Sequence, residues 1–163
     1  MEDREPVPTD AAPELPRGRF PGRLDDKARL KLPAAFAQFF NSLPERRLYL
    51  TSLDRRIATL YPVAEWRVNE KFFKDYRANP AAAKNILFNS QDLGGDVELD
   101  SQGRITVHPD LRRELGMEGT ELHLMAARGH VEILTDSLYQ ERKQKALAAA
   151  ARDLELLEMD GLR

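Results

Sequence analysis

The sequence of 163 residues contains no cysteine, so it can form neither a disulfide nor a thiolate zinc site. It also lacks the run of about 18 apolar residues that a membrane span requires. No glycine-rich phosphate loop or nucleophile motif is present, and the histidines, His108, His123 and His130, have no recognised metal spacing. These absences predict a protein that is not an enzyme and that has no metal, cofactor, membrane or small-molecule partner. The acidic, proline-bearing start does not read as a secretory signal, and cytoplasmic localisation is expected.

The net charge is only −2, but the charges are unevenly distributed along the chain. Residues 18–60 carry nine basic and four acidic groups, whereas residues 92–136 carry four basic and ten acidic groups. A basic segment on a nearly neutral protein can produce a local positive field that attracts nucleic acid. The alternative interpretation is a chance fluctuation within an ordinary charged surface.

An internal repeat organises the chain. The segment Leu24–Leu32 recurs 75 positions later as Leu99–Val107, and both copies place an Asp four residues before an Arg. Each copy is followed by a short helix-like stretch and then by two strand-like segments. Residues 1–17, rich in proline and acidic groups, predict a disordered tail.

The chemistry of the repeated motif favours a tight turn between antiparallel strands. An Asp side chain bonds nearby backbone donors, and the small fourth residue takes a left-handed conformation. Gly103 suits that position, while Ala28 adopts it at a cost of about 1 kcal/mol. Each repeat therefore predicts a unit of β-hairpin, short helix and strand pair. One unit is too small to bury much core, so two should share one.

Helical signals occupy the rest of the chain. One helix is predicted to begin near Pro62, a second at Asn79-Pro80, and a long one after Ser137, which has the spacing of a capping box with Gln140. The predicted fold class is α+β, with two pseudo-symmetric half-domains, linking helices and a C-terminal helix. The predicted boundaries are 1–17 for the tail, 18–64 and 94–138 for the half-domains, 65–93 for the linking helices and 139–163 for the C-terminal helix.

The paired motifs resemble those of the MraZ family of transcriptional regulators, from about Arg17 to about Tyr139. Arg17-Gly18 matches the family's Arg-Gly before the first motif, and Tyr61–Trp66 resembles its Tyr-Pro-x-x-Glu-Trp helix opening. One Asp-x-x-x-Arg motif occurs by chance everywhere, but two in this context form a specific signal.

The resemblance implies two AbrB-like halves related by a pseudo-twofold axis, assembled as a ring. It further implies binding to short direct repeats of double-stranded DNA upstream of the division and cell-wall gene cluster, and a nucleoid-associated protein. The sequence departs from the family at three places: Ala28 replaces the usual glycine, His108 stands where proline is common, and Pro21-Gly22 interrupt the first predicted strand.

The candidate DNA-binding residues surround the first motif, where alternating strand positions would put several on one face with Lys27 at the tip. Arginine can bind guanine bidentately, and lysine suits phosphate. For Arg29 two roles stay open, DNA contact or pairing with the motif Asp, and for Arg104 the structural role is favoured. Asp25, Asp100, Gly103 and Arg104 form the structural turn motif. The proposed DNA-binding set is Arg19, Arg23, Lys27, Arg29 and Lys31.

A different class of function competes with DNA binding. The acidic second half and the long final helix also suit an oligomeric, non-catalytic protein-interaction module that binds little DNA. Salt dependence separates the two hypotheses, because contacts to phosphate weaken steeply with salt. An AbrB-like antitoxin is disfavoured, because the domain is doubled and no long toxin-binding tail is present.

Overall fold

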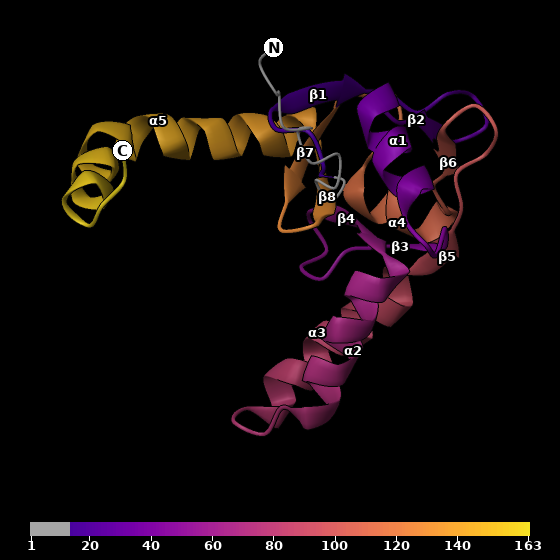
Figure 1. The fold of residues 1–163 in the computed structure, drawn as a ribbon, viewed down its shortest axis with the longest axis horizontal. Coiled ribbons are helices and arrows are strands. Elements are labelled where there is room, and N and C mark those ends of the chain that lie inside the picture. Colours follow the sequence, from indigo (N-terminus) through magenta and orange to yellow (C-terminus); the bar gives the residue numbers. More distant parts are fainter. Residues whose placement is uncertain (1–13) are drawn as a thin grey trace, which may run out of the picture.

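The computed structural model describes residues 14–163, so most of the predicted tail lies outside the described residues. Within that range the chain is α+β, as predicted, with antiparallel strands and five helices (Figure 1). The strands are β1 (Arg19–Gly22), β2 (Arg29–Lys31), β3 (Leu48–Thr51), β4 (Ala58–Pro62), β5 (Gly95–Val97), β6 (Arg104–Thr106), β7 (Leu122–Ala127) and β8 (His130–Thr135). The helices are α1 (Ala34–Ser42), α2 (Val63–Asp75), α3 (Pro80–Leu93), α4 (Pro109–Leu115) and α5 (Asp136–Met159).

Two antiparallel sheets form the centre of the fold. The larger has six strands in the order β1-β7-β8-β4-β3-β5, and the smaller is a two-stranded ribbon of β2 and β6. Strand β1, from the first repeat, pairs with β7, from the second. Strand β5, from the second repeat, pairs with β3, from the first. Strands of one repeat thus pair with strands of the other repeat within the same chain.

This exchange differs from the predicted self-contained hairpin of each repeat. The turn after Leu24 is present, but only one antiparallel bridge, Leu24 to Leu30, joins its two sides. The regular strands β1 and β2 pair elsewhere, with β7 and β6. The alternation of apolar and polar residues predicts which residues are extended and which face is buried. It does not predict the partner strand, because many partners satisfy the same alternation.

The interruption expected at Pro21-Gly22 does not occur, because both residues lie within β1. Strand β1 is at the edge of the large sheet, where proline is tolerated because its missing N–H removes no bond needed inside the sheet. Gly22 has a packing role as well: a Cβ atom there would lie 2.9 Å from Leu30 Cδ1 and 3.1 Å from Leu124 Cδ1.

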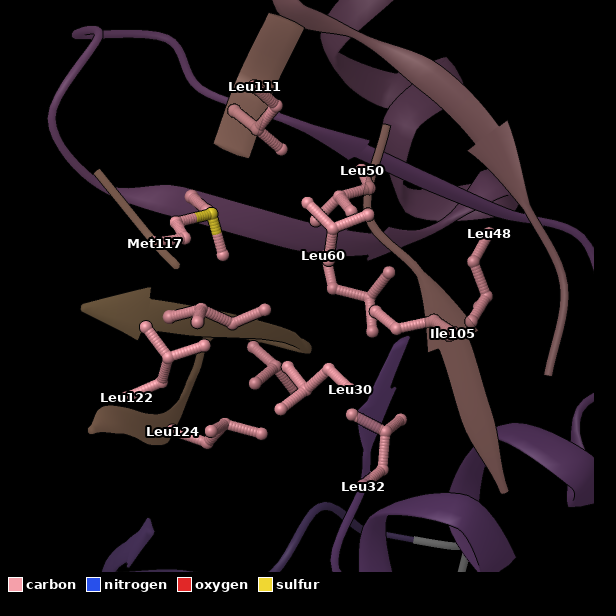
Figure 2. Close-up of a cluster of buried hydrophobic side chains, with 14 of the residues drawn as sticks. Leu30, Leu32, Leu48, Leu50, Leu60, Ile105, Leu111, Met117, Leu122 and Leu124 are labelled. Carbon is pink, nitrogen blue, oxygen red and sulfur yellow. The ribbon is translucent and has the colours of Figure 1, made fainter. Parts of the chain in front are cut away.

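One hydrophobic core joins residues from both repeats (Figure 2). Leu30 on β2 and Ile105 on β6 are fully buried in it, together with Phe36 from α1 and Leu111 from α4. The aromatic side chains of Phe36, Phe40 and Trp66 are also buried. The two repeats therefore share their core, as the small size of each unit requires.

The helix ends follow local chemistry. Asn79 caps α3, its side chain accepting a hydrogen bond from the Ala82 N–H at 3.2 Å, and Pro80 occupies the first turn. Gly116 ends α4 in the left-handed conformation at φ 66°. The capping box predicted at Ser137 is wrong: α5 begins at Asp136, and Thr135 is its cap, accepting from the Leu138 N–H.

Two helical arms project from the sheets in different directions, the α2–α3 pair and the outer part of α5 (Figure 1). Helix α5 contacts the sheet through its first turns, where Leu138 is buried, and Arg56 pairs with Glu141 at 2.5 Å. Beyond that point nearly every residue of α5 is exposed. Among the described residues, no helix is both long enough and apolar enough to cross a membrane.

Candidate nucleic-acid interface

The first motif forms a turn built around the Asp25 carboxylate. One oxygen, Oδ1, accepts hydrogen bonds from the N–H groups of Lys27 at 3.0 Å and Arg29 at 2.8 Å. The other, Oδ2, accepts from Nε of Arg29 at 2.8 Å. Ala28 adopts the left-handed conformation at φ 57°. The backbone hydrogen bond from Arg29 is the main cause that lowers the pKa of Asp25, which is therefore held as a carboxylate.

The second motif repeats this arrangement. The Asp100 carboxylate accepts from the N–H groups of Gln102 and Arg104, both at 2.9 Å, and from Nε of Arg104 at 2.7 Å. Gly103 is left-handed at φ 75°. The backbone bond from Arg104 and its side-chain bond lower the pKa of Asp100 to about 2. Both motif arginines therefore donate to the aspartate of their own turn, through the backbone N–H and through Nε.

The ribbon of β2 and β6 ties the two turns together. Its register opposes Arg29 to Thr106, Leu30 to Ile105 and Lys31 to Arg104. At one end the Leu32 N–H donates to the Gly103 carbonyl, and at the other the Val107 N–H donates to the Ala28 carbonyl. Because the pairing is antiparallel, the two turns lie at opposite ends of the ribbon.

The ribbon has two different faces, since side chains alternate along a strand. Leu30 and Ile105 are fully buried on the core face. The opposite face carries Arg29, Lys31, Arg104 and Thr106. Three of these four side chains are basic, so this face presents positive charge along its length.

The structure separates the predicted DNA-binding residues into two groups. Lys27 is exposed in the first turn, Arg29 is half-buried and Lys31 is exposed, so these three line the ribbon and its end. Arg23 is exposed in the loop leading to the first turn. Arg19 lies on β1 in the other sheet, where its Nη1 is 2.9 Å from His123 Nδ1 and its guanidinium lies over the Tyr139 ring at 4.9 Å.

Sequence reasoning did not include Arg104 and Arg46 in the DNA-binding set. Arg104 lies directly across the ribbon from Lys31. Arg46 and Lys31 line the same hollow of about 660 Å³, between α1 and the second turn, with the polar side chains of Asn41 and Gln102. The internal repeat could have indicated Arg104 as a DNA-binding candidate, because Arg104 occupies the same position in the second motif as Arg29 in the first. Nothing local in the sequence marks Arg46.

The motif arginines keep donor capacity after pairing with aspartate. Their side chains are 26% exposed for Arg29 and 23% for Arg104, and each uses Nε for its Asp. Among the described residues, neither guanidinium uses its Nη1 or Nη2 atoms in a hydrogen bond. The aspartate therefore orients a guanidinium whose outer nitrogens can bind phosphate or a guanine edge.

The basic excess of residues 18–60 is only partly available to a ligand. Arg55 pairs with Asp92 at 2.7 Å and with Glu114 at 2.8 Å, which links it to α3 and α4. Arg56 pairs with Glu141 of α5. Acidic residues of α3, α4 and α5 thus neutralise part of the first half's charge, and the free positive charge is confined to a smaller surface.

His123, Glu121 and Asp136 offer ligand atoms within 4.8 Å of one another, the one group among the described residues whose composition suits a metal ion. His123 is buried, and its Nε2 is 2.8 Å from Asp136 Oδ1. A guanidinium always donates, so the Arg19 bond to Nδ1 places the ring proton on Nε2, directed at Asp136. The hydrogen bond from His123 is the main cause lowering the pKa of Asp136. We interpret this chain of bonds as a structural link between β1, β7 and α5.

Comparison with known proteins identifies the class. A relative from Acidobacterium capsulatum is 30% identical over 129 residues, which cover 78% of this chain and 87% of the relative. A relative from Koribacter versatilis is 41% identical over 100 residues, which cover 60% of this chain and 67% of the relative. A relative from Burkholderia cenocepacia is 32% identical over 134 residues, which cover 80% of this chain and 89% of the relative. Each bears the name transcriptional regulator MraZ. No protein-family model matches the chain.

The class is that of transcriptional regulators, which are not enzymes. The chain belongs to the MraZ family. The sequence-based prediction of the family is thereby confirmed, as are the predictions that the chain is a transcriptional regulator and not an enzyme.

Proposed function

We propose that this regulator binds double-stranded DNA through the outer face of the β2–β6 ribbon and the turn at one end of it. The observation that carries this proposal is the alignment of Arg29, Lys31 and Arg104 on the face opposite the core. The major groove of DNA admits a two-stranded β-ribbon. Lys27 in the first turn and Arg23 beside it add contacts to phosphate at that end.

The aspartates of the two turns set the geometry of this surface. A carboxylate repels phosphate, so Asp25 and Asp100 are not contacts themselves. They hold Nε of Arg29 and Arg104 and direct the remaining nitrogens outward. The same arginine can therefore hold its turn and contact DNA. Its bond to aspartate orients the guanidinium in advance, so the side chain loses less conformational freedom when it binds DNA.

The distribution of charge predicts a weak contact for a single chain. The ribbon face offers three basic side chains, and two of them are partly neutralised by their aspartates. Affinity should therefore come from several chains that bind together. We propose a ring-shaped homo-oligomer that presents identical ribbons to short direct repeats, which raises avidity without new contacts. The targets, by resemblance to the family, lie upstream of the division and cell-wall gene cluster, and the protein is cytoplasmic and nucleoid-associated.

The same proposal assigns the chain two half-domains, at residues 18–64 and 94–138. Helices at 65–93 link them, and a further helix occupies 139–163. The matching hydrogen bonds of the two turns and the exchanged pairings β1 with β7 and β3 with β5 support two related halves. In this arrangement neither half forms its sheet alone, and the ribbon is complete only when both are folded.

DNA binding is tested by titrating the protein with DNA from upstream of its own gene and with a shuffled sequence, at two salt concentrations. Arg29→Ala and Arg104→Ala should each weaken specific binding by about 1–3 kcal/mol, and Lys31→Ala should reduce the salt slope by about 1. Arg142→Ala, at an exposed position of α5, is the matched control and should bind like the wild type.

Two results would contradict the proposal. Loss of binding in Arg29→Ala with full binding in Arg104→Ala would remove the ribbon as the binding surface. If a folded oligomer bound both DNAs with the same affinity at both salt concentrations, the result would favour the protein-interaction module instead. Each variant is checked by circular dichroism, because both arginines also hold their turns.

A further inference from the structure

Exposed apolar side chains of the described residues gather on the two helical arms and not on the sheets. They lie on the α2–α3 pair, along the outer part of α5 and just after its end, and they are Val68, Phe72, Phe88, Leu147, Leu154, Leu156, Leu157, Met159 and Leu162. Isolated exposed apolar residues are ordinary on protein surfaces, but aligned ones mark interaction sites. Each arm carries one aligned set.

The first set forms a hollow of about 500 Å³ on the outer side of α2, which we name the α2 hollow. Its lining residues are Val68, Lys71, Phe72, Asp75, Tyr76, Arg77 and Ala78. Val68, Phe72 and Tyr76 are spaced by four residues and so follow one side of the helix. Phe72 is 56% exposed, and Tyr76 stacks on it with ring centroids 5.1 Å apart, which fixes the floor of the hollow.

The charge around the α2 hollow is positive. Lys71 and Arg77 belong to its lining, against one acidic residue, Asp75. Over residues 71–84 the sequence has four basic groups and one acidic group. An apolar floor with a basic rim suits an apolar side chain carried by an acidic helix.

The second set forms a stripe on α5, which we name the α5 stripe: Leu147, Ala150, Leu154 and Leu157. The spacings of three and four residues put these side chains on one face of the helix. The three leucines are each at least half exposed, although large apolar side chains favour burial. Residues 153–160 contain four acidic groups and no basic one, so acids flank the end of the stripe.

We propose that the α5 stripe of one copy of this chain docks into the α2 hollow of a second copy. The two surfaces match in apolar character, and the acidic end of the stripe at residues 153–160 is opposite in charge to the rim of the hollow, which sets both the partner and its orientation. Within one chain they cannot meet in this structure, because the two arms project in different directions (Figure 1). The contact is therefore between copies.

A parallel self-contact, stripe against stripe, is electrostatically unfavourable, because it would bring Asp153 and Glu158 of one helix close to the same acids of another. Docking of the stripe into the hollow uses different surfaces of the two copies. In such a pair one copy keeps a free hollow and the other keeps a free stripe, so further copies can be added. Such a head-to-tail contact repeats from copy to copy, and it forms a ring where the rotation between successive copies closes. The inference rests on the ring assembly of the proposed function and does not depend on DNA binding.

The first test measures the mass of the full chain by sedimentation velocity over a range of concentrations. Phe72→Ser in the hollow and Leu154→Ser in the stripe should each raise the dissociation concentration at least about tenfold. Leu156→Ser is the matched control, because Leu156 is equally exposed but lies on the other side of α5. Circular dichroism verifies that each variant stays folded, which is expected for exposed positions.

The second test uses charge reversal and mixing. Lys71→Glu with Arg77→Glu damages the hollow, and Asp153→Lys with Glu158→Lys damages the stripe, so each double variant should assemble poorly. Mixing them should restore assembly, because each supplies a surface complementary to the other's. A shared fault in folding would not be repaired by mixing.

Three outcomes would overturn the inference: a monomeric wild type, full assembly of Phe72→Ser, or no recovery in the mixture. Full assembly of Phe72→Ser beside a failing Leu154→Ser would indicate stripe-to-stripe pairing instead. DNA titration of the same samples keeps the two proposals apart. Assembly without DNA binding would contradict the DNA interface proposed on the β2–β6 ribbon, and it would still support the contact between the α5 stripe and the α2 hollow.

Discussion

At the scale of single residues, the Asp-x-x-x-Arg motif forms a turn in which the aspartate orients the guanidinium of the arginine. The carboxylate of Asp25 or Asp100 satisfies two backbone donors and one guanidinium nitrogen, so three bonds converge on one side chain. Bonds to the charged form stabilise that form, and this is why the pKa of both aspartates falls. The turns are therefore sensitive to protonation.

We expect Asp100→Asn to lower the stability at neutral pH and to lose this effect in acid. The pKa of Asp100 is lowered from 3.8 to about 2, so the charged carboxylate stabilises the folded state above pH 3.8. That contribution is lost as the pH falls through 2. Urea unfolding of both proteins across this range gives the difference, which should be largest at neutral pH and vanish only below pH 2.

Asp26→Asn is the control for this pH dependence, since Asp26 is exposed in the first turn and accepts no hydrogen bond within the described residues. Its free energy of unfolding at pH 7 should stay within about 0.5 kcal/mol of the wild type. A difference for Asp100→Asn that persisted at low pH would contradict the role assigned to the carboxylate charge.

At the scale of elements, the end of α3 is tightly packed against β3. Tyr49 Oη donates to the Ser90 carbonyl at 2.6 Å, and Thr51 Oγ1 donates to the same oxygen at 2.8 Å. Gly94 follows the helix at this point. A Cβ atom on Gly94 would lie 1.9 Å from Tyr49 Oη and 2.1 Å from the Ser90 carbonyl oxygen. The helix can approach the strand only because residue 94 has no side chain.

Gly94→Ala should therefore lower the free energy of unfolding by about 3 kcal/mol, as strained overpacking does. The neighbouring substitution Gly95→Ala is a matched control, because its Cβ would be no closer than 3.4 Å, to His108 Nδ1. That variant should stay within about 0.5 kcal/mol of the wild type. Thermal and urea unfolding of both proteins measure the two effects, and equal losses would show that the contact is not the cause.

At the scale of the whole molecule, the exchanged strands make the two repeats one folding unit. Strand β1 completes the sheet beside β7, β5 lies beside β3, and the ribbon joins β2 to β6. The buried residues of both repeats form one core (Figure 2). Removing an apolar side chain from one repeat should consequently destabilise the other.

Leu111→Ala tests this coupling. Leu111 is fully buried on α4 in the second repeat, and its truncation should cost about 3 kcal/mol. The single tryptophan, Trp66, lies at the start of α2 and stacks on Tyr49 of the first repeat. Its fluorescence should report the full loss as a lower urea midpoint, whereas Leu156→Ala should leave it unchanged. A Trp66 transition unmoved by Leu111→Ala would mean that the repeats unfold independently.

Much of the architecture was predictable because it follows from local chemistry. The repeated turns, the starts of α3 and α4 at their prolines and the end of α4 at Gly116 depend on residues within a few positions of each other. Where two local signals competed, the prediction missed: Ser137 has the spacing of a capping box, but Thr135 is the cap. Tertiary packing of the preceding strand decides between such neighbours.

Of the candidate site, sequence reasoning recognised the motif arginines but not their common surface. Arg29 and Arg104 are 75 residues apart, and each has a structural partner of its own. Only the pairing of β2 with β6 places Arg104 opposite Lys31. In the same way only the fold reveals that Arg19 bonds His123 and that Arg55 is held by Asp92 and Glu114.

The sequence by itself therefore determined the family, the α+β class, the extended and helical segments and the two turns, since each depends on short-range pattern or on resemblance. The tertiary structure decided which strands pair, which face of the ribbon is free, and which charges remain available. The physical reason is that a strand's alternation specifies a buried face without specifying a neighbour. Neighbours are chosen by the packing of the whole core, which joins residues far apart in the chain.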